Sequence, residues 1–325
     1  MAFQYATVNS GGMSTHYHAR SLDFIANTLK ENLNLMYAQV WQHGELLDEY
    51  QRMPVKTRLN VWSVCKGCVS CAFGIAESEG LITKDEKIVD IFPEYVPENP
   101  SENLMNIRIR DLLTMRTGLE NPLFFCDSPE RYTTKDWIKA FFDASFSDVP
   151  GTYFRYSNFG TFMVSCAIEK KAGVNLLEYL RYRLFEPIGI GNPDWTLDPK
   201  GHVHAANGWY VTIDELARFG HLMLGMGEYN GKQLVPREYM LEATSTIVPQ
   251  DFPGLKDCTG DRSIGYGYYF FRKPDGNSFS VDGNYGQYCI TLPAKDAVVV
   301  VMSLEGGDRY NKIGDYLWRD LISKL

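Results

Sequence analysis

One serine and one lysine in this sequence are spaced so that the lysine could activate the serine. They stand in Ser63-Val64-Cys65-Lys66, the only S-x-x-K element in the chain. A serine hydroxyl becomes an effective nucleophile when a base accepts its proton, and three positions apart on a helix the two side chains share a face. If a helix begins near Ser63, the positive end of its dipole disfavours the charged ammonium form of Lys66, and burial has the same effect. A neutral Lys66 could then accept the serine proton. Alone the element is weak, because roughly one S-x-x-K arises by chance in a chain of this length.

A second element, Tyr156-Ser157-Asn158, is the only Y-x-N in the chain and follows the turn-forming Pro150-Gly151. A tyrosine beside a lysine can pass a proton to a leaving group. An asparagine amide can hydrogen-bond the lysine or a substrate carbonyl. The alternative is that Asn158 caps the helix that follows and Tyr156 packs in the core.

The third element is residues 281–287, with the sequence VDGNYGQ at the opening of a strand. Gly283 permits a close backbone approach, so the amide of Asn284 could join that of Ser63 in an oxyanion hole. The alternative is a hairpin that simply contains glycines. Residues that could line a substrate pocket near these elements are Trp209, Tyr210, Val281, Tyr285 and Gln287.

Apolar periodicity and turn residues divide the chain into two ends rich in strands and a mostly helical middle. Strands are expected at 35–41, 45–50, 265–271, 278–281, 288–292 and 297–303. Helices are expected at 21–33, 63–78, 134–144, 158–172, 176–185, 213–224 and 312–324. We therefore predict an α+β fold: residues 1–85 and 261–325 form an antiparallel sheet flanked by helices, residues 86–260 form an inserted, mostly helical domain, and the active site lies between them.

Composition argues against several classes of function. The net charge is −8 and the basic residues are scattered, which argues against nucleic-acid binding. No window approaches 18 uncharged apolar residues, so no membrane span is expected. Residues 1–18 lack the apolar segment of a signal peptide, which predicts a cytoplasmic protein if Met1 is the natural start; the mature part of an exported protein would look the same.

Neither a metal nor a cofactor is expected. Cys65, Cys68 and Cys71 would share a helical stripe, but no fourth ligand follows at a zinc-site spacing, and buried reduced thiols are favoured. His202 and His204 could share a strand face and bind a metal, although a loop or pocket rim is the better interpretation. Phosphate-binding glycine loops, a G-x-S-x-G elbow and an H-E-x-x-H helix are missing from the sequence.

In combination, the three elements resemble the beta-lactamase-related serine hydrolases, which include class C beta-lactamases, D-alanyl peptidases, family VIII esterases and 6-aminohexanoate-dimer hydrolases. That superfamily carries S-x-x-K, then Y-x-N about ninety residues later, then K-T-G, H-x-G or W-x-G near the C-terminus. Here Ser63 and Tyr156 are 93 positions apart (156 − 63). The segments 109–118, 150–158 and 207–220 also resemble segments of the family, so the likeness covers about residues 20–320.

The resemblance implies the fold predicted above and a role for each residue. Ser63 would be the nucleophile, Lys66 the base and Tyr156 its proton partner. The amides of Ser63 and Asn284 would form the oxyanion hole, and Asn158 would position Lys66 or the substrate.

Two departures from the family pattern bear on substrate choice. Val281 stands where the family has a basic or aromatic residue, so substrates with a carboxylate lose a partner, and Asp282 would repel them if it faced the pocket. Arg262, Arg272 or Lys273 could supply the missing cation. Met115 and Thr117 replace a family His and Ser.

The sequence therefore predicts a serine hydrolase that acts through an acyl-enzyme on a small-molecule ester, amide or peptide-like substrate. A beta-lactamase or a D-alanyl carboxypeptidase-type penicillin-binding protein is the first alternative. A binding homologue without turnover is the second, and the intact Ser63, Lys66, Tyr156 and Asn158 argue against it.

Overall fold

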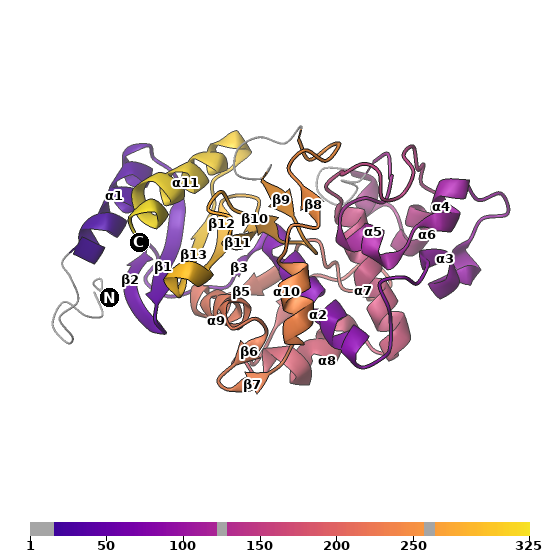
Figure 1. Ribbon diagram of the computed structural model, residues 1–325, viewed down its shortest axis with the longest axis horizontal. Helices are drawn as coiled ribbons and strands as arrows, with labels where there is room; N and C mark the ends of the chain where they lie inside the picture. The colour runs from indigo at the N-terminus through magenta and orange to yellow at the C-terminus, as the bar shows by residue number, and fades with distance from the viewer. Residues whose placement is uncertain (1–15, 122–128, 257–263) are drawn as a thin grey trace.

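The structure, a computed structural model, describes residues 16–121, 129–256 and 264–325. Figure 1 shows the main sheet with the terminal helices α1 (His16–Lys30) and α11 (Tyr310–Tyr316) on the left, and helices from the middle of the chain on the right. The predicted α+β fold, an antiparallel sheet flanked by helices, is confirmed. No helix within the described ranges is both long and apolar enough to cross a membrane.

The main sheet has eight strands in the order β2-β1-β13-β12-β11-β10-β9-β8. Their bounds are β1 Leu35–Gln42, β2 Glu45–Gln51, β8 Val248–Pro249, β9 Gly265–Tyr266, β10 Phe271–Arg272, β11 Phe279–Gly283, β12 Gln287–Leu292 and β13 Ala297–Ser303. The first and last parts of the chain meet where β1 pairs with β13, with Ala38 opposite Val301. Sequence-distant ends therefore build one sheet, as the pattern of strands predicted.

Both faces of this sheet are covered, so β11, β12 and β13 are buried along their whole length. Because side chains alternate along a strand, Cys289 and Val300 join the larger core on one face, whereas Ile290 and Val299 join a second core on the other. The second core includes Leu317 and the rest of the C-terminal helical segment beside α1. The larger core extends into α2 (Cys65–Ser78) and the helices of the middle.

The middle of the chain is mostly helical. Its helices are α3 Ile88–Ile91, α4 Glu102–Asn106, α5 Ile109–Leu113, α6 Trp137–Phe142, α7 Asn158–Ala172, α8 Leu176–Leu180, α9 Ile213–Leu224 and α10 Arg237–Ala243. Short strands β3 (Leu59–Asn60), β5 (Trp209–Val211) and β4 (Asp194–Trp195) form a second sheet, and β6 (Glu228–Tyr229) pairs with β7 (Lys232–Gln233). The bounds of α7, α9 and β13 agree with the sequence prediction.

The division of the chain at residues 85 and 260 stays a prediction. Helix α9, which that division places in the helical insertion, packs on β12 and β13. Strand β8 lies in the same insertion and pairs with β9. Part of the middle segment thus belongs physically to the main sheet.

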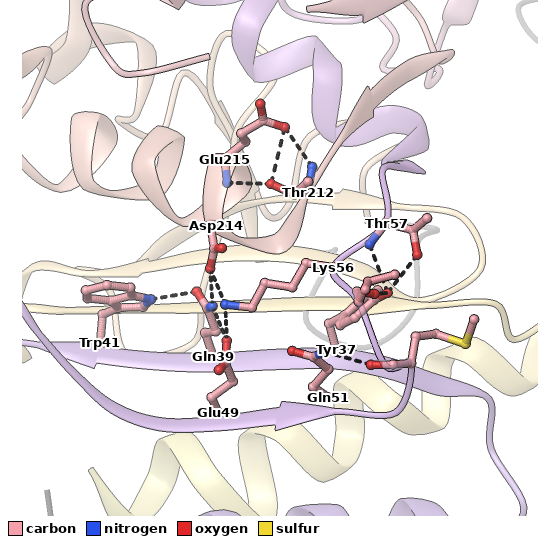
Figure 2. A network of polar contacts seen from close by, with 12 residues as sticks. Tyr37, Gln39, Trp41, Glu49, Gln51, Lys56, Thr57, Thr212, Asp214 and Glu215 are labelled. Carbon is pink, nitrogen blue, oxygen red and sulfur yellow. Dashed lines mark hydrogen bonds and ion pairs between the residues drawn. The ribbon is translucent and has the colours of Figure 1, made fainter. Parts of the chain in front are cut away.

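A polar network fixes the chain segment that leads from β2 toward Ser63 (Figure 2). Lys56 Nζ lies 2.7 Å from Glu49 on β2 and 2.8 Å from Asp214 on α9. The buried Gln39 donates to the same two carboxylates, at 2.6 Å each. Tyr37 donates its hydroxyl to the Val55 carbonyl at 2.8 Å. These contacts tie Val55 and Lys56, shortly before β3 begins at Leu59, to the sheet and to α9.

Candidate active site

Ser63 lies in a short 3-10 turn, Trp62–Val64, that runs directly into α2 (Cys65–Ser78). The sequence predicted a single helix from residue 63, whereas the structure places the serine just before the α-helix begins. Helix α2 is buried from Cys65 to Ala76, and its small residues make this possible. A β-carbon at Gly74, for example, would lie 2.3 Å from the ring of Tyr239.

Lys66 is 1% exposed, and its Nζ lies 2.9 Å from Ser63 Oγ. Nζ also donates to Asn158 Oδ1 at 2.8 Å and to the Ala206 carbonyl at 3.0 Å. All three partners are neutral, and no carboxylate among the described residues lies within ion-pair distance of Lys66. Asn158 and Ala206 accept hydrogen bonds from Nζ, and Nζ also lies within hydrogen-bond reach of the Ser63 hydroxyl, whose proton a base at this position would have to accept.

Asn158 reaches Lys66 because a neighbouring residue caps the helix. Ser157 is the N-cap of α7, and its Oγ accepts a hydrogen bond from Gly160 N at 2.9 Å. Asn158 is the first residue of α7 and is 1% exposed. The capping alternative for Asn158 is therefore wrong, and its amide belongs to the cluster around Lys66.

Tyr156 lies beside Lys66 through its ring rather than its hydroxyl. Lys66 Nζ is 4.9 Å from the ring centroid, and the ring stacks on Phe271 at 6.1 Å with an interplanar angle of 13°. Within the described ranges no hydrogen bond joins the Tyr156 hydroxyl to Ser63 or Lys66. Catalytic hydrogen bonds often form only once substrate is bound, so a role in proton transfer stays a prediction.

The Ala206 carbonyl belongs to a loop between β4 and β5 that is anchored at both ends. At one end, His202 Nδ1 lies 2.6 Å from Glu169 Oε2 near the end of α7. At the other end, Gly208 N donates to Asn60 Oδ1 at 3.0 Å, and the same oxygen accepts from Trp62 N at 2.9 Å. Asn60 thus couples the loop to the turn that carries Ser63.

The two histidines of this loop have separate roles. The hydrogen bond to Glu169 raises the pKa of His202. Burial, together with the nearby charge of Lys66, lowers the pKa of His204 to about 3, so His204 is neutral at pH 7. They do not form a shared metal site, because His202 faces Glu169 and His204 lies near Lys66.

One cluster among the described residues has the donor set of a metal site. Ligand atoms of Cys166, Glu169 and His202 lie within 4.8 Å of one another. However, burial raises the pKa of the Cys166 thiol, whereas metals bind the thiolate. Glu169 already accepts from His202, and its other oxygen accepts from Val203 N at 3.1 Å. We therefore describe the cluster as an ion pair that anchors the loop.

The third element lies against the turn that carries Ser63, because that turn packs on β11 and β12. A β-carbon at Gly283 would lie 2.4 Å from the Val61 carbonyl oxygen and 3.2 Å from Ser63 N. Only glycine permits this approach, as the sequence predicted. Asn284 directly follows Gly283 and is half-buried.

Val281 and Asp282 point to opposite faces of β11. Val281 is 1% exposed, and a β-carbon at Gly67 on α2 would lie 2.8 Å from its Cγ1. Asp282 is paired with the buried Lys273 at 3.0 Å and accepts a hydrogen bond from Ser280 at 2.5 Å. The negative charge of Asp282 is therefore paired with Lys273, and the side chain does not face the same side of β11 as Val281, so the repulsion of a substrate carboxylate is not expected.

The three cations that could have replaced a basic third-motif residue do not stand open beside Val281. Lys273 is fully buried against Asp282. Arg272 donates to the carbonyls of Thr244 and Gly276, at 2.5 Å each. Arg262 lies outside the described residues.

The pocket candidates are scattered. Trp209 is fully buried and packs on Trp195 at 5.7 Å between ring centroids, so it is a core residue. Gln287 is also buried and donates to the Ser303 carbonyl at 2.5 Å. Tyr210 is half-buried on β5, opposite Asn60. Of the five candidates, Tyr285 is the exposed one, at 38%.

Sequence reasoning missed two features beside Ser63. The first is the Ala206 carbonyl, which carries no side-chain signal. The second is Trp62, whose ring packs in a tilted arrangement against that of Tyr285, with centroids 4.7 Å apart and an interplanar angle of 30°. The sequence shows an aromatic residue next to Ser63, but it does not show its contact partner, which is more than two hundred positions away.

Comparison with protein-family models matches residues 25–321 to the Beta-lactamase family. The chain belongs to the Beta-lactamase family. The resemblance seen in the sequence is therefore confirmed, and the chain is a member of a family of serine hydrolases.

Several solved structures share this fold. A candidate 6-aminohexanoate-dimer hydrolase from Bacillus anthracis is 21% identical, with 90% of this chain and 80% of that chain covered and a TM-score of 0.76. A family VIII carboxylesterase is 15% identical, with 96% and 99% covered and a TM-score of 0.70. A penicillin-binding protein from Bacillus halodurans is 18% identical, with 91% and 99% covered and a TM-score of 0.69. At these identities the likeness shows the fold alone.

One curated relative is the uncharacterized protein BpOF4_21049 of Alkalihalophilus pseudofirmus. It is 24% identical over 237 residues, which cover 67% of this chain. The match spans 63% of that protein's length.

Proposed function

We propose that the protein hydrolyses small, neutral esters or amides through an acyl-enzyme on Ser63. The observation that carries this proposal is the contact of 2.9 Å between Ser63 Oγ and Lys66 Nζ, in a setting where the other partners of Nζ are neutral acceptors. A positioned base of this kind contributes roughly 10²–10⁴ in rate.

In the proposed reaction, Lys66 accepts the proton of Ser63 Oγ while that oxygen attacks the substrate carbonyl carbon. Negative charge develops on the carbonyl oxygen, and in this proposal the amides of Ser63 and Asn284 stabilise it. The leaving group departs with a proton supplied through Lys66, with Tyr156 as the partner in that transfer. Water then attacks the acyl-enzyme, and the same groups act in reverse to release the acid.

The preference for neutral substrates rests on the charges around β11. Val281 offers no cation, and Lys273 is committed to Asp282 on the opposite face of the strand. A charge-assisted hydrogen bond to a substrate carboxylate is worth about 1.5–3 kcal/mol, or roughly ten- to a hundredfold in binding. Substrates that depend on such a bond, such as beta-lactams and peptides ending in D-Ala, should therefore be poor.

The first experiment is labelling with a fluorophosphonate, followed by identification of the modified residue by mass spectrometry. We expect labelling on Ser63, and loss of both labelling and ester hydrolysis in Ser63→Ala. Ser78→Ala is a matched control, because it removes a serine at the far end of the same helix and should leave both unchanged. Labelling elsewhere, or a fully active Ser63→Ala, would refute the assignment.

The second experiment compares a neutral short-chain ester with nitrocefin and penicillin G. We expect a much higher kcat/KM for the ester. Equal turnover of nitrocefin would favour the beta-lactamase alternative. No turnover of any ester or amide, without labelling of Ser63, would favour a binding protein.

A further inference from the structure

Two aromatic residues adopt a backbone conformation that normally favours glycine. Trp62 has φ = +50° and Tyr285 has φ = +64°. A side chain with a β-carbon is strained there, and bulky residues are rare in this region. Strain of this kind persists only where the surroundings enforce it, and it concentrates at functional sites.

These two positions flank the two proposed oxyanion donors. Trp62 directly precedes Ser63, and Tyr285 directly follows Asn284. Their rings meet with centroids 4.7 Å apart, although one belongs to the turn before α2 and the other to the turn between β11 and β12. The strained backbone at each position thus brings two rings together beside the nucleophile.

The ring pair is not part of the core. Tyr285 is 38% exposed and Trp62 is half-buried, so apolar ring surface stands in contact with solvent. Two hydrogen bonds hold the backbone of Tyr285: its carbonyl accepts from Glu305 N at 3.2 Å and from Gln287 Nε2 at 3.4 Å. A pre-formed, exposed aromatic surface next to a reacting atom is a typical wall of an organic-ligand site.

We propose that the Trp62–Tyr285 pair is the wall of a subsite that binds a flat or extended apolar group of the substrate, such as an aromatic ring or an alkyl chain. This inference rests on the proposed function of Ser63 and adds the substrate class. Burial of the apolar group against the rings raises kcat/KM for substrates that carry such a group. The kcat/KM of short substrates, which do not reach the rings, is not raised.

The test is a chain-length series of 4-nitrophenyl esters, acetate to octanoate, and a second series of acetate esters with alkyl and benzyl alcohols. In the wild type, kcat/KM should rise with apolar size in at least one series. In Trp62→Gly and Tyr285→Gly, the ratio of the longest to the shortest substrate should fall about tenfold or more. Tyr285→Phe keeps the ring and should keep the ratio.

Stability separates a binding wall from a structural brace. Glycine relieves the strain at each position, so the glycine variants should unfold at the same urea concentration as the wild type or at a higher one. Asn230→Gly is the control: it removes a side chain from a residue with a similar backbone conformation, φ = +50°, in the exposed β6–β7 turn, and should leave the substrate ratio unchanged. If a glycine variant fails to fold, Tyr285→Asn removes the ring with a residue that tolerates this conformation.

The outcomes distinguish the two proposals. If Ser63 of the wild-type protein is not labelled, the proposal that the protein is a serine hydrolase is contradicted. If the protein is labelled and active but the ratio of long to short substrates is the same with and without the rings, only the proposal of the subsite is contradicted. Loss of stability in the variants with an unchanged ratio would show that the pair is a brace.

Discussion

Lys66 and Lys273 are both almost wholly buried, at 1% and 0% exposed, but they have different partners. Lys273 lies 3.0 Å from the carboxylate of Asp282. Lys66 contacts a hydroxyl, a side-chain amide and a backbone carbonyl, all neutral. A buried ammonium beside a carboxylate is held in its charged form, because losing its proton would leave the carboxylate unpaired. Among the described residues, Lys66 has no carboxylate partner of this kind.

The difference separates a structural lysine from a candidate catalytic one. Lys273 and Asp282 fix the edge of β11 on the face away from Val281, and Ser280 completes the pair with a hydrogen bond. The Lys66 cluster brings together α2, the start of α7 and the β4–β5 loop, three segments far apart in the sequence. Burial alone would not have told the two lysines apart.

Replacing each lysine by methionine is the most direct way to break this comparison. Lys66→Met should lower kcat/KM by roughly 10²–10⁴, because the base is lost, and Tyr156→Phe should cost a comparable or smaller factor. Kinetics on the folded fraction of each variant, with a neutral ester, measures the effect. The double variant should lose little more than Lys66→Met if one proton path uses both groups. Losses that multiply would show separate roles.

Lys273→Met should act on stability instead. It leaves the Asp282 carboxylate buried without its cation, which costs about 3–5 kcal/mol of unfolding free energy. Urea denaturation measures the loss, and kcat/KM per folded molecule should stay near the wild-type value. Asp282→Asn in the same chain should recover part of the stability, since the orphaned charge is gone. A Lys273→Met protein as stable as the wild type would contradict the role assigned to the pair.

Giving Lys66 a charged partner tests the comparison of the two lysines further. Asn158→Asp places a carboxylate at the oxygen that now lies 2.8 Å from Lys66 Nζ, so Lys66 acquires the surroundings of Lys273. The carboxylate opposes loss of the lysine proton, and we expect kcat/KM at pH 7 to fall by about a hundredfold. Activity should return as the pH is raised. A pH–rate profile beside that of Asn158→Ala, which adds no charge, is the measurement.

Much of the fold followed from local patterns in the sequence. Helix α9 has the predicted bounds because its apolar periodicity and its Thr212 cap are local signals. Helix α7 and strand β13 are buried along most of their length, and their bounds follow from turn residues beside them, Gly173 after α7 and Asp296 before β13. The Ser63, Lys66 and Asn158 contacts could be predicted because three spaced elements together resembled a family. The assignment of catalytic roles to them stays a prediction.

Other features depend on distances that local patterns do not contain. The face to which Asp282 points depends on the register of β11, and its partner Lys273 was known only as a neighbouring cation. Trp209 was predicted to line a pocket because of its residue type, but its side chain on β5 packs in the core. The contact between Trp62 and Tyr285 requires two left-handed residues and the meeting of two distant turns.

The last prediction concerns the anchor of the loop that gives Lys66 one of its neutral partners. The hydrogen bond to Glu169 raises the pKa of His202, and Asp198 acts in the same direction while Lys200 opposes it. A raised pKa in the folded state means that the ion pair contributes fully at pH values below the ordinary histidine pKa, about 6.5. Its contribution is lost as the pH rises through the raised value.

His202→Gln should therefore lower the unfolding free energy by about 1 kcal/mol at pH 6 and by less at pH 9. Urea titrations of wild type and variant at both pH values give the two differences. Glu169→Gln should show the same trend, because it removes the other half of the pair. Since the anchored loop carries the Ala206 carbonyl to Lys66, kcat for a neutral ester should fall modestly in both variants, with KM little changed. A stability difference that grows toward pH 9 would show that the ion pair is not what holds the loop.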